Sequence, residues 1–144
     1  MKIITSFALV VLAALPATAQ TPADTAGIRQ AALDYIEGWY SGNADRMTRA
    51  LHPELAKRIM NADSLGNVWI GQQGASQLIQ GARAGFGTRT PADRRRTDVR
   101  VLDIFQNAAS ARIDAGGWID YLHLVKWQGR WVILNVLWEV RRGP

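Results

Sequence analysis

The spacing of apolar residues changes along the chain from a helical period to strict alternation. From Ile28 to Trp39 apolar side chains recur at i, i+3, i+4 and i+7, which is typical of one face of an amphipathic helix. Thr21-Pro22 followed by Asp24 predicts where this helix begins, because a hydroxyl caps the first turn and proline suits its first position. Three helices are expected: Pro22 to Gly42, Asn43 to His52-Pro53, and Ala75 to Gly85-Phe86-Gly87.

Beyond Arg96 the apolar period becomes two, which predicts β-strands. Strands are expected over 98–106, 110–114, 118–127 and 131–140, with two weaker ones over 58–60 and 67–70. Helices come first and a meander of strands follows. The fold class expected is therefore α+β, with N-terminal helices packed on one face of an antiparallel sheet.

The last hairpin has a register if Gln128-Gly129 forms a two-residue turn. One face of the sheet then carries Tyr121, His123 and Trp138. The helix-facing side carries Trp118, Asp120, Leu122, Asn135 and Leu137. Both faces are largely apolar, whereas a sheet with one face in water alternates apolar and polar residues. A second subunit is expected to cover the first face, which predicts a homodimer and a structural or interface role for His123.

The N-terminus has the pattern of a secretory signal peptide: Met1-Lys2, an apolar run from Ile3 to Leu15, and Ala17-Thr18-Ala19 as a cleavage site. The predicted domains are a signal peptide over 1–19 and a single domain over 20–144. The apolar run is too short for a spanning helix, so no membrane insertion is expected after removal of the leader. The predicted location is periplasmic or secreted, and an uncleaved anchor is the alternative.

Composition excludes several kinds of site. The 144 residues include two histidines and no cysteine, so no metal site is expected, and neither thiolate chemistry nor disulfides are possible. Gly71 to Ser76 contains neither a nucleophile elbow nor a phosphate-binding loop, and no cofactor is expected. The formal charge of +5 includes the run Arg94-Arg95-Arg96, which is interpreted as a solvated linker because no aromatic residues are interleaved with it. A nucleic-acid partner is not expected.

One polar group stands in an apolar setting on the helix-facing side of the hairpin, namely Asp120. Burial there is expected to raise the pKa of this carboxyl, so that it could donate a proton near neutral pH. The alternative is a satisfied buried acid that bonds to Tyr35 or Asn135 and ties helix to sheet. His52, at the expected end of a helix, either reaches the rim of a cleft or has a capping role.

The six tryptophans exceed what a small core requires, so some are expected to line a cavity for a ligand. Trp69 and Phe86 are either core residues or part of that cavity. The candidate ligand-binding residues are Tyr35, Trp39, Trp69, Phe86, Trp118, Asp120, Leu122, Asn135 and Leu137. The candidate catalytic residues are Asp120, Tyr35 and, with weaker support, His52.

Three segments carry a resemblance to a known family: "ALDYIEGWY" over 32–40, "RALHPELAKR" over 49–58 and "WIDYLHLVKWQGRWVILNVLWE" over 118–139. With the order of helices and strands, they resemble the lumazine-binding-like family of the nuclear transport factor 2-like superfamily. The resemblance covers the predicted mature chain. It implies a curved sheet wrapped around the helices into a cone with an apolar internal cavity, commonly in a dimer.

The same superfamily includes ketosteroid isomerases, which use a tyrosine and a neutral aspartic acid as an oxyanion hole. The resemblance would place Tyr35 and Asp120 in those roles. The catalytic base would fall at Arg58 to Met60, where the chain has no carboxylate. Related polyketide cyclases and dehydratases use Asp/His pairs, which would correspond to Asp120 and His52.

The sequence is compatible with three functions. The first is an exported domain that holds a small apolar or aromatic molecule in a cone-shaped pocket. The second is a cofactor-independent acid/base enzyme of dehydratase, cyclase or isomerase type that uses Asp120 and Tyr35. The third is a dimeric interaction domain without a ligand. Fold kinship does not decide among them, because function depends on the site.

Overall fold

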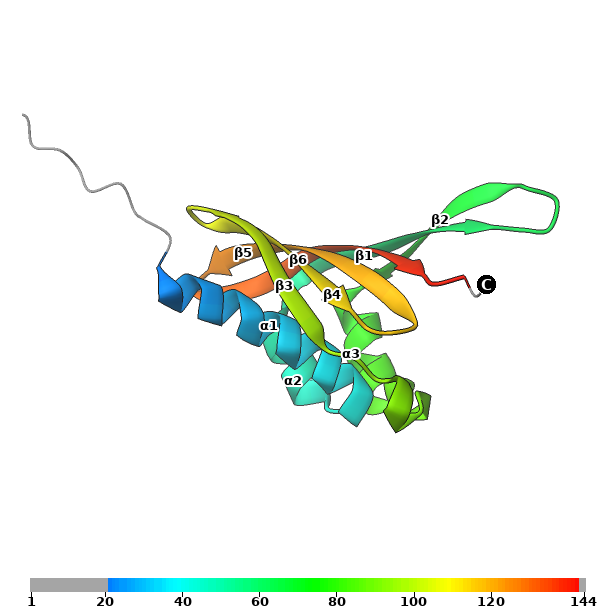
Figure 1. The fold of residues 1–144 in the computed structure, drawn as a ribbon, viewed down its shortest axis with the longest axis horizontal. Helices are drawn as coiled ribbons and strands as arrows, with labels where there is room; N and C mark the ends of the chain where they lie inside the picture. The colour runs from blue at the N-terminus through cyan, green and yellow to red at the C-terminus, as the bar shows by residue number, and fades with distance from the viewer. Residues whose placement is uncertain (1–20, 143–144) are drawn as a thin grey trace, which may run out of the picture.

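The computed structural model describes residues 21–142, which form three helices against a six-stranded sheet (Figure 1). The helices are α1 (Pro22–Ser41), α2 (Ala44–Ala50) and α3 (Ala75–Arg83). The strands are β1 (Leu51–Ala62), β2 (Val68–Gly74), β3 (Asp98–Phe105), β4 (Ala108–Asp114), β5 (Trp118–Trp127) and β6 (Arg130–Val140). Two 3-10 turns, η1 (Gly87–Arg89) and η2 (Ala92–Arg94), connect α3 to β3. The predicted α+β class is confirmed, and the predicted signal peptide lies outside the described residues.

The first two helices begin at the caps expected from the sequence. The hydroxyl of Thr21 accepts a hydrogen bond from the backbone N–H of Asp24 at 3.2 Å, and the Asp24 carboxylate accepts one from the Thr21 hydroxyl at 2.8 Å. The Asn43 side chain accepts from the backbone N–H of Arg46 at 2.9 Å and caps α2. Each cap satisfies a backbone donor that the helix itself leaves unpaired.

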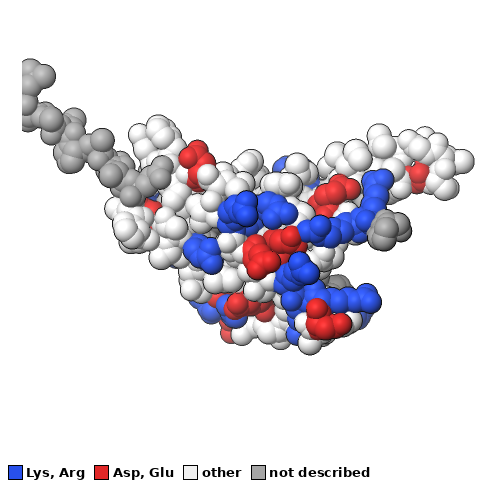
Figure 2. All heavy atoms as spheres, viewed as in Figure 1, with Lys and Arg blue, Asp and Glu red and all other residues white. Residues whose placement is uncertain are grey.

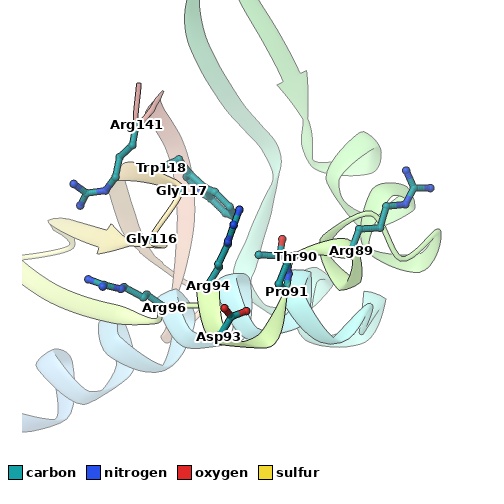
Figure 3. Close-up of a pocket in the computed structure, with 10 residues that line it drawn as sticks. All are labelled: Arg89, Thr90, Pro91, Asp93, Arg94, Arg96, Gly116, Gly117, Trp118 and Arg141. Atoms are coloured by element: carbon teal, nitrogen blue, oxygen red, sulfur yellow. The ribbon is translucent and has the colours of Figure 1, made fainter. Parts of the chain in front are cut away.

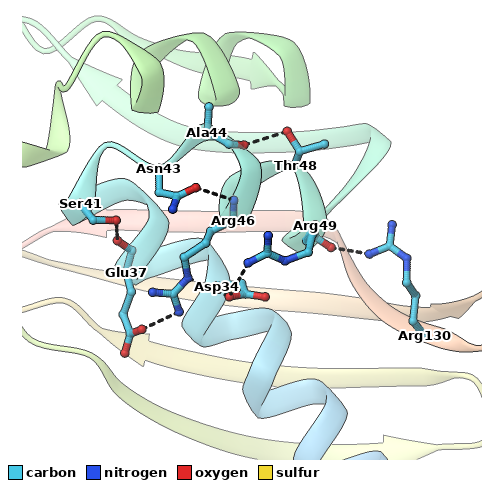
Figure 4. Close-up of polar contacts among 9 residues, drawn as sticks. All are labelled: Asp34, Glu37, Ser41, Asn43, Ala44, Arg46, Thr48, Arg49 and Arg130. Carbon is cyan, nitrogen blue, oxygen red and sulfur yellow. Dashed lines mark hydrogen bonds and ion pairs between the residues drawn. The ribbon is translucent and has the colours of Figure 1, made fainter.

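A charged network holds α2 against α1 (Figure 4). Arg46 bonds to Asp34 at 2.8 Å and to Glu37 at 2.5 Å, so one guanidinium joins two carboxylates of α1. Arg49 adds a 3.6 Å ion pair with Asp34, and its carbonyl accepts from Arg130 of β6 at 2.5 Å. The two helices and the sheet are therefore connected by polar contacts at this end of the domain.

The sheet has the order β2-β1-β6-β5-β4-β3, and the apolar faces of the helices pack on one side of it. Neighbouring strands are antiparallel, except that β1 and β6 run parallel to each other. The first strand of the chain therefore lies beside the last one. The largest fully buried side chains are those of Ile28, Ile36, Met47, Ile113, Leu122, Ile133, Val132, Val136 and Asp120. Asp120 is the charged member of that set.

The first strand is longer than the sequence indicated. β1 begins at Leu51, directly after α2, whereas a strand was expected only over 58–60. His52-Pro53 was expected to end a helix, and it lies inside β1 instead. Pro53 falls in the interval between Leu51 and Ala56 where the pairing with β6 is interrupted, so its missing N–H removes no ladder bond. The extension carries Lys57 into the sheet.

The last hairpin follows the expected register only as far as Leu124. Its turn is Gln128-Gly129, with both residues at positive φ, and Leu124 pairs with Ile133 as predicted. The next pair is His123 with Asn135, so Leu134 is an extra residue that forms a bulge. A shift of one residue exchanges the two faces of a strand, and the predicted pairing beyond this point is therefore wrong.

The bulge reverses the side chains of the second half of β6. Trp138 pairs with buried Asp120 and lies on the helix side, although it was expected on the opposite face with Tyr121 and His123. Asn135 and Leu137 were expected on the helix side, and the register places them on the opposite face, where Leu137 is 58% exposed. In residues 21–142 no helix has the length and apolar character needed to cross a bilayer.

Candidate functional site

A cavity of about 330 Å³ opens between α1, α3 and the sheet, and we name it the inner cavity. Its walls come from every layer of the fold. They are formed by Tyr35, Ile36, Trp39, Lys57, Gln73, Leu78, Phe86, Thr90, Trp118 and Trp138. Five of these ten side chains are aromatic, so half of the wall residues present flat apolar rings, and Lys57 is the charged residue of the wall.

The segment after α3 closes one side of the inner cavity because it approaches α1 closely. Gly87 lies against the backbone of Trp39, where an added Cβ would clash with the Trp39 carbonyl. Glycine therefore permits an approach that a side chain would prevent. Phe86 and Thr90, on either side of this contact, are positioned at the cavity wall.

Three polar side chains from three elements meet beside the inner cavity. The Lys57 ammonium on β1 donates to the Asp120 carboxylate on β5 at 2.9 Å and to the Tyr35 hydroxyl on α1 at 2.6 Å. The side chain of Lys57 is 8% exposed and that of Asp120 is fully buried. The indole N–H of Trp118 donates to the other carboxylate oxygen of Asp120 at 2.8 Å. We name Tyr35, Lys57 and Asp120 the buried triad.

An aromatic ring also faces the Lys57 ammonium. Its Nζ lies 4.6 Å from the centre of the Trp138 ring. This distance falls within the range of cation–π attraction, which is strongest where water is excluded. The ammonium thus replaces its lost hydration with the Asp120 carboxylate, the Tyr35 phenol oxygen and the Trp138 ring.

The protonation of the buried triad follows from its donors and acceptors. Lys57 and Trp118 both donate to Asp120, which fits a carboxylate that only accepts. Lys57 makes two hydrogen bonds in the described chain, so the third N–H of its ammonium has no protein acceptor there. Because Lys57 lines the inner cavity, this N–H is a donor that a ligand could use.

The pKa of the Tyr35 phenol is raised well above its ordinary value. Burial is the largest cause, followed by the negative charge of Asp120 and a hydrogen bond to that carboxylate. The phenol therefore keeps its proton throughout the physiological range. It can donate to Asp120 while it accepts from Lys57, which places it as a neutral bridge in the triad.

Four of the sequence-predicted ligand residues line the inner cavity: Tyr35, Trp39, Phe86 and Trp118. Asp120 lies beneath the wall and is connected to it through hydrogen bonds with Lys57, Trp118 and Tyr35. The other four residues lie elsewhere: Leu122 in the core, Asn135 and Leu137 on the opposite face of the sheet, and Trp69 on β2 with 53% exposure.

His52 lies far from the buried triad along the sheet. Its ring packs edge-on against Trp127 with centroids 4.9 Å apart, and its Nδ1 accepts from the backbone N–H of Glu54 at 3.1 Å. Trp127 ends β5, whereas Asp120 is near its beginning. The structure does not bring His52 and Asp120 together as an acid/base pair.

Six residues of the cavity wall were not predicted from the sequence: Ile36, Lys57, Gln73, Leu78, Thr90 and Trp138. Lys57 and Trp138 matter most, because they supply the charge of the site and the ring that faces it. A signal for Lys57 existed: it alternates with the apolar residues Leu55 and Ile59, which share its face of a strand that is longer than expected, and Leu55 is part of the core. Trp138 was placed on the wrong face because no residue in the sequence marks the bulge at Leu134. Residues 21–142 contain no cluster of three or more His, Cys, Asp or Glu side chains that could hold a metal ion.

Comparison with known proteins identifies the same family that the sequence resembles. The profile of the family described as "Putative lumazine-binding" matches residues 23–139, which is nearly all of the described chain. Among curated proteins there is no match. The resemblance inferred from three sequence segments is therefore confirmed.

Solved structures share the fold at low sequence identity. One NTF2-like protein of unknown function from Shewanella baltica is 19% identical, with a TM-score of 0.62 over 86% of this chain and 99% of that one. Another from Methylobacillus flagellatus is 21% identical, with a TM-score of 0.63 over 86% and 97%. An NTF2-like protein with a cystatin-like fold from Novosphingobium aromaticivorans is 12% identical, with a TM-score of 0.61 over 85% and 84%. These likenesses establish the architecture alone.

Replacement of Lys57 tests the energetics of the buried triad. We expect Lys57→Met to lower the free energy of unfolding by about 3–5 kcal/mol, because it leaves the fully buried Asp120 carboxylate without a counter-ion. The double variant Lys57→Met/Asp120→Asn removes the charge as well and should recover a large part of this loss. Urea denaturation of the three proteins measures the difference, and a double variant no more stable than Lys57→Met would contradict the argument.

The raised pKa of Tyr35 predicts a pH dependence of stability. Below about pH 10 the phenol is protonated in both the folded and unfolded chain, so it adds no dependence. Above that pH the unfolded chain loses the proton while the folded one retains it, and stability should fall as pH rises. Between pH 9 and 11 the urea midpoint of Tyr35→Phe should fall with rising pH less steeply than that of the wild type. It should still fall, because burial also raises the pKa of Tyr40. An unchanged slope would refute the assignment.

Proposed function

Because the chain belongs to the "Putative lumazine-binding" family, we propose that it is a binding domain that holds one small aromatic or apolar molecule in the inner cavity. The observation that carries this proposal is an aromatic cavity with a buried ammonium in its wall. Ligand sites in proteins are commonly apolar hollows of this size class, with a few polar groups that fix orientation.

The shape and chemistry of the walls favour a flat ligand. Trp39, Phe86, Trp118 and Trp138 offer ring faces and edges, and aromatic pairs gain attraction beyond the area they bury. The free N–H of Lys57 calls for an acceptor atom, such as a carbonyl or ring nitrogen. A heteroaromatic ring with acceptor atoms would satisfy both requirements, in keeping with the ligand that the family description names.

The geometry supports binding more strongly than acid/base catalysis by Asp120. The carboxylate is fully buried, accepts from Lys57 and Trp118, and is not part of the cavity wall. A general acid or base must come within hydrogen-bond reach of the reacting atom. The groups of the buried triad that do border the cavity are Tyr35 and Lys57. Of these two, Lys57 has an N–H left to hold an acceptor atom of a ligand, because the Tyr35 hydroxyl accepts from Lys57 and its proton is directed to Asp120.

Export of the protein and its dimerisation are further parts of this proposal. Export rests on the leader pattern over residues 1–19. Dimerisation rests on exposed apolar side chains on the sheet face opposite the helices, where Tyr121 and Leu137 pair directly across β5 and β6 with 48% and 58% exposure. Contiguous apolar surface of this kind is often covered by a partner.

Binding can be tested with N-phenyl-1-naphthylamine, an uncharged aromatic probe whose fluorescence rises in apolar sites. We expect saturable binding at one site per chain, and we expect Thr90→Trp to weaken it at least about tenfold because the indole would fill space at the cavity wall. Ser76→Trp adds the same indole at an exposed position of α3 away from the wall and should bind as the wild type does. Absence of saturable binding in the wild type would overturn the proposal.

Charge on the outer sheet face tests dimerisation. We expect the wild type to sediment as a dimer and Tyr121→Lys/Leu137→Lys to sediment as a monomer, because like charges would meet across a two-fold interface. Leu65→Lys places a charge on a side chain that is 85% exposed in the β1–β2 connection and should leave the dimer intact. Sedimentation equilibrium distinguishes these results, and a monomeric wild type would refute this part of the proposal.

A further inference from the structure

A second, larger hollow adjoins the inner cavity, and we name it the arginine hollow (Figure 3). Its volume is about 710 Å³, and it shares Thr90 and Trp118 with the wall of the inner cavity. The segment from η1 to η2 forms one side, and the β4–β5 turn with the end of β6 forms the other. Its remaining lining residues are Arg89, Pro91, Asp93, Arg94, Arg96, Gly116, Gly117 and Arg141.

The arginine hollow is strongly positive. Four guanidinium groups and one carboxylate line it, which gives 4 − 1 = +3, and basic side chains gather around the hollowed right-hand part of the surface in Figure 2. Arg141 is already paired with Asp114 at 2.5 Å, and Arg89 lies over the Phe86 ring at 5.1 Å. Arg94 and Arg96 make no ion pair with any described residue. In Figure 3 the side chain of Arg94 extends toward Trp118.

The backbone that carries Arg94 and Arg96 is held in place by the arginine between them. Arg95 donates to the carbonyls of Thr90 and Thr88, both at 2.8 Å, and lies 5.7 Å from the centre of the Tyr40 ring. Gly116, at φ +77°, lies so close to Arg94 that an added Cβ would be 2.6 Å from its carbonyl oxygen. Arg95 therefore has a structural role, and its two neighbours are left unpaired at the hollow.

The two hollows differ in charge, and that difference indicates the polarity of the ligand. Within the inner cavity the Lys57 ammonium is neutralised by Asp120, so its wall has no net charge to balance an anion. The unbalanced positive charge lies outside, at Arg94 and Arg96. Guanidinium groups bind carboxylate, sulfonate and phosphate oxygens through charge-assisted hydrogen bonds.

We propose that the ligand is an amphipathic anion, whose apolar or aromatic body occupies the inner cavity and whose anionic group lies in the arginine hollow against Arg94, with Arg96 adding to the positive charge of the hollow. This inference rests on the proposed function, since it assigns a polarity to the ligand of the same cavity. Trp118 and Thr90 mark the boundary between the two ends of the ligand. Contact with the anionic group gives the run Arg94-Arg95-Arg96 a role beyond that of a solvated linker.

Two probes that share one aromatic frame test this polarity. 8-Anilinonaphthalene-1-sulfonate carries a sulfonate, and N-phenyl-1-naphthylamine is the same frame without it. At low ionic strength we expect Arg94→Gln/Arg96→Gln to weaken the sulfonate probe about tenfold and to leave the neutral probe unchanged. Arg83→Gln/Arg100→Gln removes two charges that line neither hollow and should change neither affinity. The effect should shrink in high salt, because both arginines are exposed.

The outcomes separate this inference from the proposed function. If the neutral probe fails to bind, the inner cavity is not a binding site and both proposals fall. If the neutral probe binds and the two double variants weaken the sulfonate probe equally, the attraction comes from overall charge, and the arginine hollow has no specific role. If neither double variant affects the sulfonate probe, the ligand polarity proposed here is wrong while the binding proposal stands.

Discussion

The buried ion pair between Lys57 and Asp120 is the constraint on which the site depends. Burial of two charges is costly, and the cost is recovered only when geometry is good and the remaining donors and acceptors are satisfied. Here the phenol of Tyr35, the indole N–H of Trp118 and the face of Trp138 supply the additional contacts. These groups come from α1, β1, β5 and β6. The ion pair therefore fixes how four elements are arranged around the inner cavity.

Because Asp120 neutralises the Lys57 ammonium, the two hollows suit different parts of a ligand. A buried ammonium without Asp120 would attract an anion into the interior, where desolvation is expensive. With Asp120 in place the interior offers a single N–H donor and aromatic surface, which suits an uncharged part of a ligand. The arginine hollow is open to water, so an anion bound there keeps part of its hydration. Different residues can then recognise the hydrogen-bonding part of a ligand in the inner cavity and its charged group in the arginine hollow.

Local signals in the sequence predicted much of the fold, and long-range features escaped it. Thr21 and Asn43 mark helix starts that depend on neighbouring residues only, and the apolar period of two beyond Arg96 marks strands. The bulge at Leu134 leaves no such mark, because an extra residue in β6 is defined by its partner strand. The cavity residues Lys57 and Trp138 depend on those features, so the sequence yielded Tyr35, Trp39, Phe86 and Trp118 but not the cation between them.

Structures that share this architecture at 12–21% identity show that the fold tolerates nearly complete replacement of its side chains. Chemistry must then reside in the few positions that line the hollows. In this chain those positions fall into two groups, one on regular secondary structure and one on a connecting segment. The buried triad is anchored in helix and sheet, whereas Arg94 and Arg96 sit on a connection held by Arg95 and by the close approach of Gly116. Arg94 and Arg96 line the arginine hollow and not the inner cavity, so these two positions can change while the wall of the inner cavity stays the same.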